Sequence, residues 1–262
     1  MDIGCAVIPA AGLGTRLRPA TLWIPKEMFP VLNTPAIAYA LEEALAAGVE
    51  RLVVVIHPRK ALLRDFLEAW ARERGPGERR VRVQWVVQEE PLGLGDAVRR
   101  AKEAVLGEAF YVLLPDELFL AETPPLLQLT RGAPATWAAI VGTQKVPLAE
   151  VHQYGMVGIG QGGRVTEMVE KPAASEAPSN VAMMGRYALT SRIFDALADV
   201  KPGAKGEIQL TDALRLLLPD GVYARHVAGE RFDIGNAAGW ARAAQALARI
   251  RRLEAPADFT RA

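Results

Sequence analysis

The 262-residue sequence lacks the features that define several classes of protein. Its one cysteine, Cys5, cannot form an internal disulfide, which fits a reducing compartment. Its net charge of +1 lacks the basic excess of a typical nucleic-acid-binding protein. No stretch approaches the ~20 uninterrupted apolar residues of a membrane span. The short N-terminal apolar run follows Asp2 and no Lys or Arg, unlike a signal peptide. We therefore expect a cytoplasmic protein with neither nucleic acid nor membrane as a partner.

Two common phosphate-binding motifs are also absent, although a phosphate loop is predicted. An apolar run from Cys5 predicts a buried strand, and the small residues, two glycines, Thr and two Arg that follow it predict an anion-binding turn. Gly12 and Gly14 are followed by Thr15-Arg16 instead of the Walker Gly-Lys-Ser/Thr, and Leu17 stands where the dinucleotide fingerprint needs a third glycine. Judged by this loop alone, an ordinary strand-to-loop turn explains the residues equally well.

The apolar patterns predict strands and helices in alternation. After the first strand we expect helix 36–47, strand 52–56, helix 60–73, strand 81–87, helix 96–105 and strand 110–114. This β-α-β-α-β order implies a parallel sheet with right-handed crossovers. The second half predicts strand 136–142, a hairpin of 154–159 and 164–172, strand 180–189, helices 191–198 and 208–218, strand 222–227 and a terminal helix to about 254.

Three polar residues lie where ligands bind in an open α/β sheet. Lys26 lies among apolar neighbours in a segment that prolines stiffen and keep out of a helix. Gln88 follows the third strand, and its amide can read a base edge. Asp116 follows the fourth strand, where a carboxylate is a natural Mg²⁺ ligand. The alternatives are a lysine that reaches the surface, a surface amide and a turn aspartate.

A fourth candidate is the Glu170-Lys171 pair at the end of a predicted strand. The carboxylate could accept sugar hydroxyls and the ammonium could meet a phosphate. A solvated ion pair at the edge of the sheet is the commoner use of such a dipeptide.

Several motifs in order carry a resemblance that covers nearly the whole chain. They are Ala10-Ala11-Gly12-Leu13-Gly14-Thr15-Arg16, Pro25-Lys26-Glu27-Met28, Gln88 with Gly93-Leu94-Gly95, Leu114-Pro115-Asp116, Tyr154-Gly155, Glu170-Lys171-Pro172, Gly206 to Asp212 and Asp233-Ile234-Gly235-Asn236. In order and spacing they resemble the sugar-1-phosphate nucleotidylyltransferase superfamily. Pro-Lys-Glu-Met and the Gly-Leu-Gly after the glutamine resemble its UTP–glucose-1-phosphate uridylyltransferase branch (UDP-glucose pyrophosphorylases).

The resemblance implies a three-layer α/β/α fold with a mostly parallel mixed sheet, a Rossmann-like nucleotidyltransferase fold. It implies a single domain of residues 1–262, with a nucleotide-binding half (1–116), a sugar-phosphate-binding half (117–236) and a C-terminal helix and tail (237–262). The implied reaction joins UTP and glucose 1-phosphate to give UDP-glucose and pyrophosphate, with Mg²⁺ as cofactor, in a homo-oligomer.

The resemblance also implies a role for each matched residue. The residues implied to bind the nucleotide are Ala10, Ala11, Gly12, Leu13, Gly14, Thr15, Glu27, Gln88 and Gly93. The residues implied to be catalytic are Arg16, Lys26, Asp116 and Lys171. The residues implied to bind glucose 1-phosphate are Gly155, Glu170 and Lys171. Those implied to bind the metal ion are Asp116 and Asp233.

The sequence departs from the family around the uracil loop and in one shortened segment. Residues 89–92 and Asp96 differ from the usual ones, and Asp96 adds negative charge near the nucleotide. The chain is also shorter than typical members between about Arg72 and Val83, where many members have a longer insertion, so the oligomeric contacts of the family need not carry over to this chain. Thymidylyl transfer, another hexose 1-phosphate and a catalytically silent nucleotide-sugar-binding paralogue therefore stay open as alternatives. A dinucleotide-dependent oxidoreductase is disfavoured by the missing third glycine.

Overall fold

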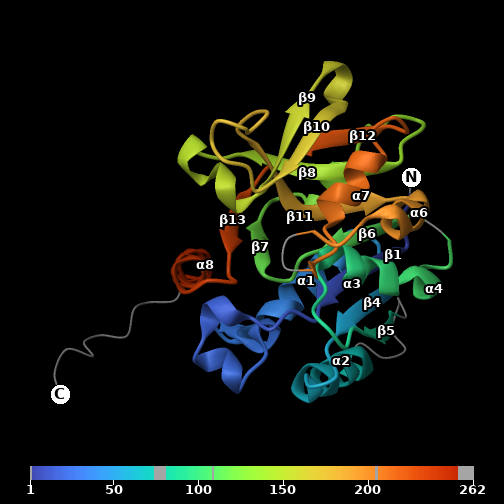
Figure 1. The fold of residues 1–262 in the computed structure, drawn as a ribbon. Helices are drawn as coiled ribbons and strands as arrows, with labels where there is room; N and C mark the ends of the chain where they lie inside the picture. The colour runs from blue at the N-terminus through green and yellow to red at the C-terminus, as the bar shows by residue number, and fades with distance from the viewer. Residues whose placement is uncertain (1, 74–80, 108, 204–205, 253–262) are drawn as a thin grey trace.

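A mixed nine-stranded sheet forms the centre of the molecule (Figure 1). The computed structural model describes residues 2–73, 81–107, 109–203 and 206–252. Seven strands follow the order β10-β9-β11-β6-β1-β4-β5, while β8 pairs with β11 and β12. These strands are β1 (Cys5–Ala10), β4 (Arg51–Ile56), β5 (Arg82–Val87), β6 (Phe110–Leu113), β8 (Ala139–Lys145), β9 (Gly155–Ile159), β10 (Val165–Glu170), β11 (Val181–Leu189) and β12 (Val222–His226).

The strand register aligns the ends of the first strands. β1, β4, β5 and β6 run parallel, and β11 then pairs antiparallel with β6. Ala10 at the end of β1 pairs with Ile56, and Ile56 pairs with Val87 at the end of β5. The loops that follow β1 and β5 therefore leave the sheet at the same edge, as the predicted β-α-β-α-β order requires.

Helices cover both faces of this sheet, which confirms the predicted three-layer fold. One face packs against α1 (Ala36–Ala46), α2 (Ala61–Glu73) and α5 (Pro125–Thr130). The other packs against α3 (Leu94–Arg100), α4 (Lys102–Val105), α6 (Arg192–Asp199) and α7 (Leu210–Leu216). Successive strand residues divide between the two layers, with Val7 in one core and Ile8 in the other. No helix in the described ranges is long and apolar enough to cross a bilayer.

Two small sheets lie beside the central one. β7 (Glu117–Leu120) pairs antiparallel with β13 (Glu230–Asp233), and β2 (Pro30–Val31) pairs with β3 (Thr34–Pro35). α8 (Ala237–Ile250) packs against both, at the left of Figure 1. The pairing of β7 with β13 brings Asp233 opposite Glu117, the residue after Asp116.

Several element boundaries differ from their predictions. Helix 96–105 is two helices, α3 and α4, that meet at Ala101. Helix 208–218 begins only at Leu210, because Ile208 bonds through its backbone to Leu92 and Gly95. Strand 136–142 is displaced to β8 (Ala139–Lys145). α8 ends at Ile250, and residues 253 and 254 of its predicted end lie outside the described ranges.

Candidate active site

The loop after β1 forms one wall of a cavity of about 400 Å³. Three short 3-10 helices follow the glycines of the loop, η1 (Thr15–Leu17), η2 (Ala20–Leu22) and η3 (Lys26–Met28). The prediction that prolines keep this segment out of a helix therefore holds for the α-helix and is wrong for 3-10 turns of three residues. The cavity is lined by Pro9, Ala11, Gly12, Leu13, Gly14, Thr15, Lys26, Gln88, Pro91, Gly93, Leu94, Ala97, Leu114, Asp116 and Glu207. Most of the residues predicted to bind nucleotide therefore face one space.

A buried lysine supports this loop from behind. Lys60 Nζ donates hydrogen bonds to the carbonyl oxygens of Ala10 (2.7 Å) and Gly12 (2.6 Å) and to Glu27 Oε2 (2.7 Å). The Lys60 side chain is 8% exposed and that of Glu27 is fully buried. Ala10 and Glu27 are absent from the lining of the cavity, so their described contacts support the loop, and their assignment to nucleotide binding stays a prediction.

Gln88 and Gly93 line the same cavity. Gln88 directly follows β5 and is 3% exposed. Gly93 has φ +96°, and a Cβ atom there would lie 2.7 Å from the carbonyl oxygen of Ile208. Since a side chain fits neither the backbone conformation nor the space, only glycine keeps this turn beside Gln88.

Two cations and two carboxylates meet around Asp116, which lines the cavity together with Lys26. Lys26 Nζ lies 2.5 Å from Asp116 Oδ2, and Arg16 NH1 lies 2.9 Å from Asp233 Oδ2. Arg16 NH2 also lies 3.8 Å from Asp116 Oδ2. η1 and η3 supply the two cations, and the β7–β13 pair brings in the two carboxylates, so three distant parts of the chain meet in one cluster.

Each member of the Lys26–Asp116 pair holds the other in its charged form. Burial lowers the pKa of Lys26, but Asp116 and Glu27 outweigh it, and the pKa lies above its usual range. Burial raises the pKa of Asp116, but Lys26 and Arg16 outweigh it, and the pKa lies below its usual range. The centre therefore presents fixed charges, suited to binding and stabilising phosphate.

Gly235 leaves room for this cluster. A Cβ atom at this position would lie 2.9 Å from Arg16 NH2 and 3.0 Å from both Asp116 Oδ2 and Asp233 Oδ1. Its backbone N–H donates to Asp233 Oδ1 (2.9 Å). Any other residue would push apart the charged groups that the β7–β13 pair brings together.

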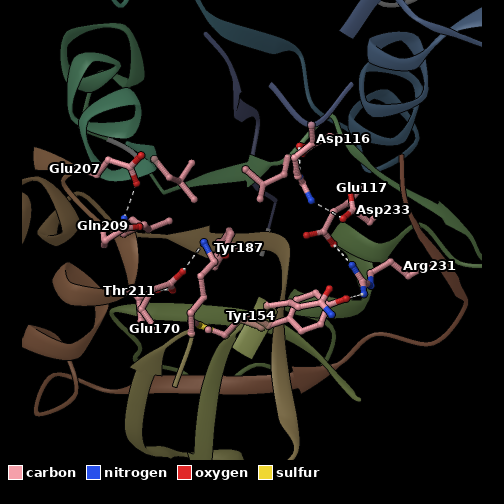
Figure 2. A pocket seen from close by; sticks show the side chains of 18 residues that line it. Asp116, Glu117, Tyr154, Glu170, Tyr187, Glu207, Gln209, Thr211, Arg231 and Asp233 are labelled. Atoms are coloured by element: carbon pink, nitrogen blue, oxygen red, sulfur yellow. Dashed lines mark hydrogen bonds and ion pairs between the residues drawn. The ribbon is translucent and has the colours of Figure 1, made fainter. Parts of the chain in front are cut away.

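A second cavity of about 620 Å³ opens on the other side of Asp116. Gly155, Glu170 and Lys171, the residues predicted to bind the sugar phosphate, line it. Figure 2 shows Asp116 and Asp233 on one wall and Thr211 on the other. Thr211 Oγ1 donates to Glu170 Oε2 (2.6 Å), and Lys171 Nζ lies 3.4 Å from Glu170 Oε1.

The two cavities share four lining residues, Leu94, Leu114, Asp116 and Glu207. Asp116 and its partner Lys26 therefore lie where a ligand in one cavity would meet a ligand in the other. Such a pair of joined cavities fits a reaction between two bound substrates, because it fixes their reacting groups next to each other.

Comparisons with known proteins agree with this geometry. The sequence profile described as "Nucleotidyl transferase" matches residues 5–249. The chain belongs to the nucleotidyl transferase family. It is 41% identical over 255 residues to UTP–glucose-1-phosphate uridylyltransferase 2 of Staphylococcus saprophyticus, covering 90% of this chain and 88% of that protein. A UTP–glucose-1-phosphate uridylyltransferase of Staphylococcus haemolyticus matches with the same identity and the same coverage.

Solved structures resemble this nucleotidyl transferase over nearly its whole length. A UDP-glucose pyrophosphorylase complexed with UDP-glucose is 36% identical, with a TM-score of 0.87, covering 95% of this chain and 100% of that one. A UTP-bound enzyme of the same kind from Acinetobacter baumannii is 36% identical, with a TM-score of 0.82, covering 97% of this chain and 95% of that one.

The donor set of this nucleotidyl transferase fits a magnesium ion that is completed by substrate. Among the described residues, no group of three or more His, Cys, Asp or Glu side chains is placed to hold a metal. Arg16 forms an ion pair with each of the carboxylates of Asp116 and Asp233. Each of these two carboxylate side chains is about one-fifth exposed. One or two carboxylates together with substrate phosphates are the usual ligands of Mg²⁺.

Sequence reasoning missed three residues that shape the site. Lys60 gave no signal, because a lysine before a helix is typical of a surface. Gly235 and Thr211 lay within recognised motifs but received no role of their own. Their importance depends on Arg16, Asp116 and Glu170, which approach them only in the folded chain.

Proposed function

We propose that this protein transfers a uridylyl group from UTP to glucose 1-phosphate, giving UDP-glucose and pyrophosphate. The observation that carries the proposal is the junction of the two cavities at Asp116 and Lys26. The uridylyltransferase relatives and the structures with UDP-glucose and with UTP support the choice of substrates.

In the proposed reaction, a phosphate oxygen of glucose 1-phosphate attacks the α-phosphorus of UTP. One phosphorus–oxygen bond forms, the bond from the α-phosphorus to the bridging oxygen breaks, and pyrophosphate leaves with that electron pair. The attacking oxygen is already an anion, so no general base is needed. The task of the protein is to hold two polyanions in line and to stabilise the charge that moves between them.

The residues at the junction suit that task. Lys26 would bind phosphate oxygens at the reaction centre, and Arg16 would bind the departing pyrophosphate. Asp116 and Asp233 would hold Mg²⁺, which when bound supplies charge neutralisation and alignment of phosphate oxygens. Residues 11–15 and Gly93 would enclose the nucleotide, and Gln88 would read its base.

The sugar-phosphate side would use the second cavity. Glu170, oriented by Thr211, would accept hydrogen bonds from glucose hydroxyls, and Lys171 would bind the phosphate. Lys171 has φ +46°, a strained backbone conformation that is common at functional sites.

The test is pyrophosphate release with glucose 1-phosphate and Mg²⁺, with UTP, dTTP, CTP, ATP and GTP supplied in parallel. We expect a strong preference for UTP. A preference for dTTP would keep the mechanism and change the nucleotide. Absence of release with every nucleotide, while UDP-glucose still binds, would refute the proposal in favour of a nucleotide-sugar-binding protein.

A further inference from the structure

A buried aspartate lies behind the residue proposed to read the base. Asp96, in the first turn of α3, is 0% exposed. Its Oδ2 accepts a hydrogen bond from Gln88 Nε2 (2.8 Å), and Gln88 lines the nucleotide cavity. None of the nucleotide, catalytic or sugar-phosphate roles described above includes Asp96.

The surroundings of Gln88 determine which way its amide points. The Nε2 group has two N–H donors, and two acceptors face it, Asp96 Oδ2 and, at 3.3 Å, the carbonyl oxygen of Gly93. The reversed amide would place Oε1 against both of these oxygens. Both contacts given for the Gln88 amide use Nε2, which leaves Oε1 as the amide atom able to accept a hydrogen bond from a ligand in the cavity that Gln88 lines.

Two arginines hold Asp96 ionised and in place. Arg99 NH2 lies 2.6 Å from Oδ1, and Arg100 Nε lies 2.8 Å from Oδ2. Burial raises the pKa of Asp96, but hydrogen bonds from Arg100, Gln88 and Arg99 outweigh it and leave the pKa below its usual range. An ionised carboxylate only accepts hydrogen bonds, so it tolerates one orientation of the Gln88 amide. The negative charge expected near the nucleotide is therefore balanced by two cations.

We infer that Asp96 is a positioning residue for base selectivity, which acts by fixing Gln88 Oε1 as an acceptor toward the base. This inference rests on the proposed function. Uracil carries an N–H at N3 and can donate to such an acceptor. Cytosine carries a bare N3, whose lone pair would face Gln88 Oε1. Thymine has the same N3–H as uracil, so the Asp96 contact discriminates against cytosine and not between UTP and dTTP.

The experiment compares kcat/KM and Kd for UTP, CTP and dTTP in Asp96→Leu and Asp96→Asn, with Tm recorded for each variant. Leucine removes the acceptor and frees the Gln88 amide to rotate. Asparagine retains an oxygen that can accept from Gln88 while Arg99 turns into solvent. Glu103→Leu, an exposed acidic residue on the neighbouring α4, is the matched control for loss of charge.

We expect Asp96→Leu to lower the UTP/CTP ratio about tenfold, the effect of losing one well-placed hydrogen bond. The UTP/dTTP ratio should not change. Asp96→Asn should keep most of the UTP/CTP ratio, and Glu103→Leu all of it. In a Gln88→Leu background, Asp96→Leu should have no further effect on the ratio, because Asp96 acts through Gln88.

An unchanged UTP/CTP ratio in Asp96→Leu, or an equal change with and without Gln88, would overturn the inference. Equal losses with all three nucleotides and a lower Tm would likewise make Asp96 a purely structural residue. A wild-type protein without turnover of UTP would instead refute the proposed function. Binding constants for UTP and CTP would still test Asp96 in that case.

Discussion

Replacing Lys60 with methionine should destabilise the protein and disorganise its nucleotide loop. Methionine keeps most of the side-chain volume and removes the charge and the three hydrogen bonds to Ala10, Gly12 and Glu27. Glu27 would then be a buried charge without its partner, since its side chain is fully buried and its Oε1 atom already has no hydrogen bond within the described structure.

The expected loss is about 3–5 kcal/mol, the usual effect of removing one partner of a buried ion pair. For a chain of this size that loss lowers Tm by about 6–20 °C. Urea denaturation gives the free energy of unfolding, with Lys102→Met, an exposed lysine on α4, as the matched control. Because Glu27 is adjacent to Lys26 in η3, kcat should also fall.

The double variant Glu27→Gln with Lys60→Met separates charge from volume. It leaves no unpaired buried charge, so it should be more stable than Lys60→Met alone. A loss of less than about 1 kcal/mol in Lys60→Met would contradict this reasoning, because that is the range of an exposed pair. A double variant as unstable as the single one would contradict it as well.

Further predictions concern the reaction centre. Lys26→Ala should lower kcat about 10²–10³-fold and raise KM less, since the ammonium stabilises moving charge; steady-state kinetics with wild-type values would remove Lys26 from the centre. Asp116→Asn should lose most turnover, and full activity at saturating Mg²⁺ would exclude it as a ligand. Thr211→Val should raise KM for glucose 1-phosphate about fivefold and leave KM for UTP unchanged, because only Glu170 loses a donor; equal changes in both values would contradict this. The Lys26–Asp116 pair should stabilise the fold between the ordinary pKa values of 3.8 and 10.5. Because folding lowers the pKa of Asp116, the stability that this carboxylate adds is lost as the pH falls through its pKa in the folded protein. Because folding raises the pKa of Lys26, the stability that this ammonium adds is lost as the pH rises through its pKa in the folded protein. The free energy of unfolding measured against pH, with Lys26→Met as the reference, checks both signs.

The strands and their loops are predictable because their signals are local. The apolar, β-branched run 52–56 indicates a strand buried on both faces, and parallel strands place their C-terminal loops at one edge. These local signals suffice to place Gln88 and Asp116 near the glycine loop. Lys26 is a candidate from its apolar neighbours and Arg16 from the glycine loop, and the family motifs add a role for each.

The β7–β13 pair is not predictable in the same way. Each strand has four residues, too short for a clear period, and 109 residues separate the end of β7 from the start of β13. Asp233 comes to Asp116 through that pairing, so the local sequence around either residue does not indicate the other. Lys60 gives no signal for a related reason, since its partners include carbonyl oxygens of a loop about 50 residues earlier.

The Pro-Lys-Glu-Met motif forms one turn whose residues are held on both sides. The Met28 N–H donates to the Pro25 carbonyl (2.8 Å) and closes η3, while Met28 packs against the core under the sheet. Within this turn Glu27 points inward to Lys60, and Lys26 points to Asp116. Because Glu27 is held by Lys60, the turn keeps the neighbouring Lys26 in position beside Asp116. Because the proposed reaction needs fixed charge in fixed places, we expect the buried Glu27–Lys60 pair to support it by holding Lys26 in position.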